Sequence, residues 1–200
     1  MKRKQSECVF PGTSLDRMPP LPAEALDERQ RKAAEELAAG PRGGVKGPFI
    51  PLLRSPELLE RLSKLGEYLR FGSTLAPRIG ELVMLIVARE WTNQFEWAVH
   101  APLAAKNGVA RETILAVAEG RSPSTMAHDE QVAYALCDEL SRTRGVSETT
   151  YRRAVACFGE AGVIDLLGVR GYFATVCAIM NVAHTPAPEG GGEALRPYPV

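Results

Sequence analysis

The chain has no excess charge of either sign, because 24 Lys and Arg residues balance 24 Asp and Glu residues among its 200 positions. A neutral protein has no general field that would draw in nucleic acid or an anionic membrane surface. Apart from the short basic opening Lys2-Arg3-Lys4, no run of like charge stands out. We therefore expect neither nucleic acid nor a membrane as a partner.

The sequence also lacks an apolar stretch suited to secretion or to a membrane. Polar residues and several prolines follow the basic opening, whereas a signal peptide continues with an apolar region. The most apolar later segment, residues 162–183, contains Asp165 and Arg170, and a membrane span needs about 20 nearly charge-free residues. We interpret this segment as a buried core helix and expect a cytoplasmic protein.

Paired cysteines are absent as well. The four cysteines, Cys8, Cys137, Cys157 and Cys177, lie far apart in the sequence, without CxxC or metal-ligand spacing. Three of them fall within apolar helical patterns, where free Cys behaves as a small core residue. A glycine-rich phosphate loop, a zinc motif and a nucleophile elbow are also missing. We expect a reduced protein with no metal site.

Apolar residues recur at helical intervals, and no useful length of the chain alternates as a β-strand would. The sequence therefore predicts an all-α fold, a single-domain bundle of about six to eight helices. The predicted helices cover residues 23–39, 56–69, 77–91, 94–106, 110–119, 128–143, 147–158 and 162–182. Residues 40–51 are predicted to form a loop, because they include four glycines and three prolines.

Three parts are predicted along the chain: an irregular N-terminal arm over residues 1–22, a helical domain over 23–184, and a Pro- and Gly-rich tail over 185–200. Neither end has a core of its own. We expect such segments to gain order by lying on a neighbouring subunit.

The residues best suited to chemistry lie between positions 81 and 100. Glu81 stands among apolar residues, and burial disfavours the charged form of a carboxyl group, which makes it useful as an acid or base near neutral pH. Glu96 and His100 are four residues apart, so they share one face of a helix. A carboxylate beside an imidazole stabilises the charged ring and fixes its tautomer.

Structural roles are the alternatives. Asn93 and Glu96 have the spacing of a capping box, in which Glu96 would only complete the start of a helix. His100 could be a core histidine, and Glu81 could point to solvent. His128 and His184 are assigned structural roles at the two ends of predicted helices.

Five segments of the chain resemble proteins of the carboxymuconolactone decarboxylase-like family, within the alkylhydroperoxidase D-like superfamily. They are Leu65–Gly72, Pro77–Leu82, Gln94–His100, Pro102–Ala104 and Lys106–Val109. The resemblance is specific over residues 47–120, looser up to Pro188, and absent over the first forty residues.

The peroxidase branch of this superfamily carries a Glu, eleven further residues, and then Cys-x-x-Cys-x-x-x-His. In this motif Glu81 matches the Glu and His100 matches the His, while Asn93 and Glu96 replace the two cysteines. Without those sulfurs the thiol–disulfide chemistry of that branch is not available. The remaining residues are similar to the decarboxylase branch, in which a Glu replaces the second cysteine.

The resemblance implies a trimer or hexamer of helical subunits and a reaction without metal or cofactor. It implies a lyase that transfers a proton to a small lactone or unsaturated carboxylic acid. His100 would donate the proton, Glu96 would orient His100, and Glu81 would act as a second acid or base. An isomerase, hydratase or lactone hydrolase, and a catalytically inactive oligomer that binds a small molecule, remain alternatives.

A substrate carboxylate would need a cation to hold it, and guanidinium groups do so with two hydrogen bonds. Arg78 shares the helix face of Glu81 and is the first candidate, while Arg70 is the second. Either could instead form a surface ion pair. Trp97, together with Leu85 and Phe95, is a candidate wall of the substrate pocket, with simple packing as the alternative for Trp97.

Overall fold

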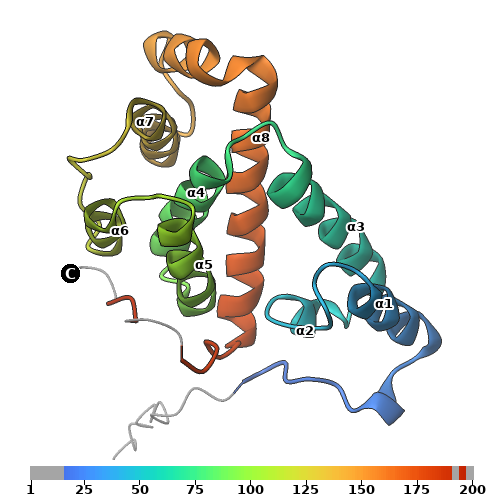
Figure 1. Cartoon of the computed structure of the whole chain (residues 1–200). Coiled ribbons are helices and arrows are strands. Elements are labelled where there is room, and N and C mark those ends of the chain that lie inside the picture. Colours follow the sequence, from blue (N-terminus) through green and yellow to red (C-terminus); the bar gives the residue numbers. More distant parts are fainter. Residues whose placement is uncertain (1–15, 191–193, 197–200) are drawn as a thin grey trace, which may run out of the picture.

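A computed structural model describes residues 16–190 and 194–196 of the chain. The predictions made for residues 1–15, 191–193 and 197–200, including Cys8, lie outside these ranges. The described part consists of helices and connecting segments with no β-strand, which confirms the all-α prediction (Figure 1). The elements, in chain order, are η1 (Ala23–Ala25), α1 (Glu28–Ala39), α2 (Phe49–Leu52), α3 (Pro56–Glu67), η2 (Tyr68–Gly72), α4 (Pro77–Glu90), α5 (Gln94–Lys106), α6 (Arg111–Ala118), α7 (His128–Thr143) and α8 (Glu148–Ala183).

Helix α4 forms the centre of the core. Every residue from Ile79 to Arg89 is buried, as expected for a helix that is apolar nearly all round. It packs against α5, α6, α7 and α8. Figure 1 shows α8 running through the middle of the molecule, with α4 and α5 on one side and α1 to α3 on the other. A smaller second core lies between α1, α2 and α3 around Phe49 and Leu59.

Helix α8 joins two predicted helices, 147–158 and 162–182, at a sharp bend. Gly159 at the bend has a φ of +69°, a conformation that glycine adopts without strain. By length and composition alone α8 is apolar enough to cross a membrane, but half of its most apolar window is buried inside the fold. Because it packs against α4 and α7, we interpret it as a core helix.

The start of the helical domain differs from the prediction. A single helix over 23–39 with Pro22 in its first turn was expected, but the chain forms the short 3-10 turn η1 and then starts again at Glu28. The cause is Asp27, which accepts a hydrogen bond from the Gln30 backbone while the Gln30 side chain accepts one from the Asp27 backbone. The predicted loop 40–51 also contains the first residues of the short helix α2.

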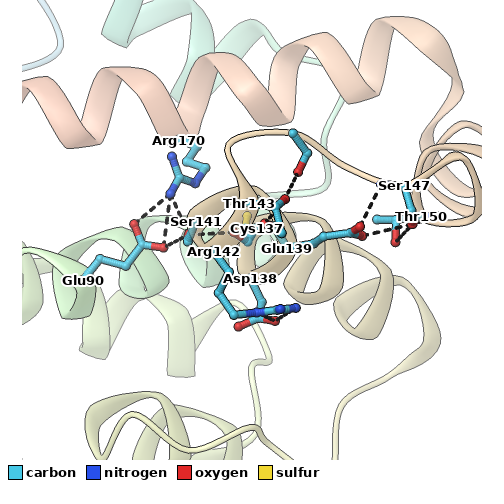
Figure 2. A network of polar contacts seen from close by, with 11 residues as sticks. Glu90, Cys137, Asp138, Glu139, Ser141, Arg142, Thr143, Ser147, Thr150 and Arg170 are labelled. Atoms are coloured by element: carbon cyan, nitrogen blue, oxygen red, sulfur yellow. Dashed lines mark hydrogen bonds and ion pairs between the residues drawn. The ribbon is translucent and has the colours of Figure 1, made fainter.

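A polar network holds the C-terminal end of α4 against α7 and α8 (Figure 2). Arg170 on α8 donates to Glu90 at 2.9 Å and to the Ser141 hydroxyl at 2.7 Å. The same hydroxyl contacts the Glu90 carboxylate and the Cys137 carbonyl oxygen. The Arg170 side chain is only 16% exposed, so this charged contact is stronger than a surface ion pair. The network fixes α4, the helix that carries Glu81.

The described parts of both ends lie on their own chain. The Arg17 backbone N–H donates to the Ala183 carbonyl oxygen at 2.7 Å, and Arg54 donates to the Pro19 carbonyl oxygen at 2.8 Å. Near the other end, Leu195 is buried and is hydrogen bonded to Gln94. The described residues of both end segments are therefore hydrogen bonded within their own chain, and their contact with a neighbouring subunit stays a prediction.

The outer face of α8 suggests how copies of the chain associate. Ile164 and Val182 are 66% and 60% exposed, and both are large apolar residues. Because exposed apolar area tends to be buried in interfaces, we expect a homo-oligomer, a trimer or a hexamer, in light scattering at micromolar concentration. Ile164→Glu should lower the measured mass, whereas Leu58→Glu, at an exposed position on α3, should not. A monomeric wild-type mass would contradict this prediction.

Candidate active site

Glu81, Glu96 and His100, called the acid–base triad below, are brought together by two consecutive helices. Helices α4 and α5 pack as antiparallel neighbours across the short turn at residues 91–93. His100 Nδ1 lies 2.7 Å from Oε2 of Glu81, and His100 Nε2 lies 3.1 Å from Oε2 of Glu96. All three side chains are buried, and the His100 ring lies perpendicular to the Phe173 ring of α8, with the two ring centroids 5.1 Å apart.

Only one of the two hydrogen bonds of the predicted capping box is present at Glu96. The Asn93 side chain accepts a hydrogen bond from the Glu96 backbone N–H at 2.8 Å, so Asn93 caps α5. The Glu96 carboxylate does not return to the Asn93 backbone but contacts His100 instead. The Asn93 amide also donates to Asn181 Oδ1 at 2.8 Å. Asn93, at the position of the first motif cysteine, is therefore a structural residue, while Glu96 is available to the triad.

The environment of His100 favours its charged form. Burial alone would lower the pKa of His100, but hydrogen bonds to Glu81 and Glu96 outweigh it and raise that pKa from 6.5 to about 9. This environment favours the imidazolium form at neutral pH, with Nδ1 hydrogen bonded to Glu81 and Nε2 paired with Glu96. The two carboxylates therefore stabilise a proton on the His100 ring.

A cavity of about 440 Å³ opens beside the triad. Glu96 and His100 line it, whereas Glu81 binds the other ring nitrogen and does not. Its aromatic lining comprises Phe49, Phe71, Phe95, Tyr172 and Phe173. Of the three residues predicted to line the substrate pocket, only Phe95 lines this cavity. Leu85 is buried in the core, and Trp97 lines a different cavity on another side of α5, beside α6.

Three cationic side chains line the same cavity: Arg42, Lys46 and Arg70. The Arg42 guanidinium stacks over the Phe49 ring at 4.4 Å and donates to the Ser63 carbonyl oxygen at 3.3 Å. Arg70 was a sequence candidate. Arg42 and Lys46 were missed, since the Gly- and Pro-rich segment that holds them shows no periodic pattern that could place them.

Arg78, the first sequence candidate for an anion contact, lies elsewhere. It forms ion pairs with Asp129 at 2.7 Å and with the buried Glu130 at 2.6 Å. These contacts tie the start of α4 to α7, and Arg78 does not line the cavity of the triad. Arg78 therefore has the alternative role considered from the sequence, that of an ion-pair partner.

The remaining histidines and cysteines lie outside the triad. His128 is exposed at the start of α7, and His184 has a left-handed conformation at the end of α8. Cys177 is near Asn93, whose amide approaches its carbonyl oxygen at 3.4 Å, but the thiol is buried, and burial raises its pKa. Burial likewise raises the pKa of Cys137 to about 12. Within residues 16–190 and 194–196, no cluster of three His, Cys, Asp or Glu side chains is arranged to hold a metal ion.

Comparison with known proteins confirms the resemblance seen in the sequence. Residues 56–136 match the model of the Carboxymuconolactone decarboxylase family, and this range includes the whole triad. The match begins later and ends later than the segment 47–120 identified from motifs. Over these residues the chain is therefore similar to that family, and the all-helical fold agrees with the similarity. No curated protein sequence matches the chain.

Two solved structures share the fold at low sequence identity. One is an uncharacterized peroxidase-related protein from Silicibacter sp. TM1040, with 13% identity, a TM-score of 0.70, and coverage of 91% of this chain and 97% of that one. The other is a protein of unknown function from Agrobacterium tumefaciens, proposed to be the antioxidant defence protein AhpD. It has 16% identity, a TM-score of 0.60, and coverage of 68% of this chain and 94% of that one. At these identities the likeness concerns the fold alone.

Proposed function

We propose that the chain is a cofactor-independent carboxy-lyase that acts on a small lactone or unsaturated carboxylic acid. The observation that carries this proposal is the buried His100 ring, held between the carboxylates of Glu81 and Glu96 beside a cavity lined with aromatic and cationic side chains. A buried Glu81 that contacts His100 supports this function over the inactive alternative, in which Glu81 would point to solvent.

The geometry modifies the roles expected for the three residues. Both nitrogens of His100 are engaged by carboxylates, so Glu96, which also lines the cavity, is the group that exchanges a proton with the substrate. His100 supplies that proton to Glu96 through Nε2. Glu81 stabilises the charged ring through Nδ1 and orients it. Glu81 is therefore a positioning residue in this scheme.

The proposed reaction breaks one carbon–carbon bond. The bond to the substrate carboxylate breaks, carbon dioxide leaves, and the electron pair moves into the conjugated carbonyl group. Glu96, which has accepted the Nε2 proton of His100, then delivers that proton to carbon, and this leaves His100 as neutral imidazole and Glu96 as a carboxylate. Solvent finally returns a proton to His100. A hydrophobic wall favours these steps because low polarity strengthens the contacts between charges.

The cationic residues around the cavity would hold the substrate. Arg70 is half-buried, and its guanidinium lies 5.2 Å from the centre of the Phe71 ring, which also lines the cavity. A guanidinium binds a carboxylate with two parallel hydrogen bonds and so fixes its orientation. Arg42, already stacked on Phe49, would bind a second anionic or carbonyl group of the substrate.

The proposal is tested by incubating the purified protein with a panel of lactones and unsaturated diacids in deuterated water. Mass spectrometry should show loss of carbon dioxide and gain of one carbon-bound deuterium. Glu96→Gln should abolish both, and Arg70→Ala should raise KM with a smaller effect on kcat. Arg61→Ala, at a highly exposed site on α3, serves as the control. Deuterium gain without loss of carbon dioxide would instead indicate an isomerase, and addition of water would indicate a hydratase or hydrolase.

The protein is not expected to turn over peroxide with thiols. Asn93 and Glu96 occupy the cysteine positions of the motif, and neither can form a sulfenic acid or a disulfide. Peroxide consumption with a dithiol reductant should equal that of a buffer blank. Consumption that disappears in a variant lacking all four cysteines would contradict the assignment.

A further inference from the structure

The turn between α4 and α5 sets how Glu81 meets His100, and its backbone is strained. Thr92 has a φ of +46°, which a β-branched residue rarely adopts. Such a conformation persists only where the surrounding structure holds it. Two contacts do so: Arg89 Nη2 donates to the Thr92 hydroxyl at 3.1 Å, and the Asn181 amide donates to the Trp91 carbonyl oxygen at 2.8 Å.

The C-terminal segment, residues 194–196, is bonded to both sides of this turn. The Gln94 amide donates to the Leu195 carbonyl oxygen at 2.8 Å and accepts from the Leu195 N–H at 2.9 Å. Arg89 donates to the Arg196 carbonyl oxygen at 2.8 Å. Gln94 is the first residue of α5 and Arg89 lies in the last turn of α4. One segment therefore links the C-terminal end of α4 to the N-terminal end of α5, the two helices that carry the triad.

The Leu195 side chain anchors this segment. It is only 4% exposed and forms part of the wall of a cavity of about 270 Å³, which Trp97 and Ile114 also line. Trp97 follows Glu96 directly on α5, so the C-terminal segment and the candidate active site lie on different faces of the same helix. A change at this wall would shift α5 relative to α4.

We propose that Gln94 and Leu195 are positioning residues for the acid–base triad, because they hold the strained α4–α5 turn in the arrangement that lets Glu81 of α4 reach His100 of α5. The consequence for catalysis rests on the proposed function, but the effect on geometry does not. Displacement of the turn by one or two ångströms would lengthen the Glu81–His100 contact beyond hydrogen-bond distance.

The test is an NMR titration of the His100 ring in full-length Leu195→Ala and Gln94→Ala variants, with His100→Gln used to assign the signal. In both variants the pKa of His100 should fall by about one unit or more, because its raised value depends on two carboxylate contacts. Helix content by circular dichroism should stay unchanged. Leu115→Ala is the control, because it removes a side chain of equal size from the same cavity and leaves the Gln94 contacts intact.

An unchanged His100 titration in both variants would overturn the inference, as would an equal shift in Leu115→Ala. If Leu195→Ala loses helix content, the Gln94→Ala titration alone tests the inference. Gln94 is half-buried, and its replacement leaves the apolar wall around Leu195 in place. The titration needs no substrate. A wild-type protein that turns over none of the panel would count against the proposed function alone.

Discussion

Replacing His100 by glutamine is expected to reduce turnover by about 10²–10⁴-fold, the usual contribution of a positioned acid or base. Glutamine keeps a hydrogen-bond donor near Glu96 but cannot supply a proton to it. The loss should appear in kcat, with KM nearly unchanged, because Arg42 and Arg70 still hold the substrate. The measurement is steady-state kinetics on the compound identified by the deuterium screen.

His100→Ala should lose turnover as well, but it should also destabilise the fold. Removing one partner of a buried ion pair leaves charge without compensation and costs about 3–5 kcal/mol. Here two buried carboxylates, Glu81 and Glu96, would face the empty site. Urea denaturation should therefore rank His100→Ala well below His100→Gln in stability.

The control for both variants is His128→Gln, which alters an exposed histidine at the start of α7. It should retain full turnover and wild-type stability. If His100→Gln also turns over normally, His100 is a packing residue and the proposed mechanism is wrong.

The helices of the core could be predicted from the sequence because their signals are local. Residues 128–143 form α7 with the predicted bounds, and α4 ends one residue before the predicted Trp91. The first helix was placed incorrectly because the Asp27–Gln30 capping box competes with the Pro22 signal. Both are ordinary start signals, and nothing in the periodicity shows which one begins the longer helix.

Part of the candidate site could be predicted for a similar reason. Glu96 and His100 share a face by spacing, and a short turn brings Glu81 beside them. The cavity wall could not be predicted, because Arg42 comes from an aperiodic loop and Phe173 from a helix more than seventy residues further along the chain. Such contacts depend on tertiary packing, which a single sequence does not display.

The triad should also make the protein less stable at alkaline pH. The pKa of His100 is raised from 6.5 to about 9 in the folded protein, by the hydrogen bonds to Glu81 and Glu96 and against the effect of burial. A group whose pKa is raised on folding stabilises the protein fully below its unfolded value. That contribution is lost as pH rises through the folded value. The free energy of unfolding should therefore fall between pH 6.5 and about 9, by an amount on the order of 3 kcal/mol at most.

Other groups titrate in the upper part of this range, so the contribution of His100 must be measured as a difference. Burial raises the pKa of the Cys137 and Cys177 thiols, which also makes the folded state less favourable as pH increases. Both thiols are present in His100→Gln. Urea denaturation of the two proteins from pH 6 to 9.5 should give a steeper fall for the wild type, and the two curves should converge at the alkaline end. Parallel curves would mean that His100 is not protonated between the two carboxylates. The proposed mechanism, which needs this protonated ring, would then be wrong.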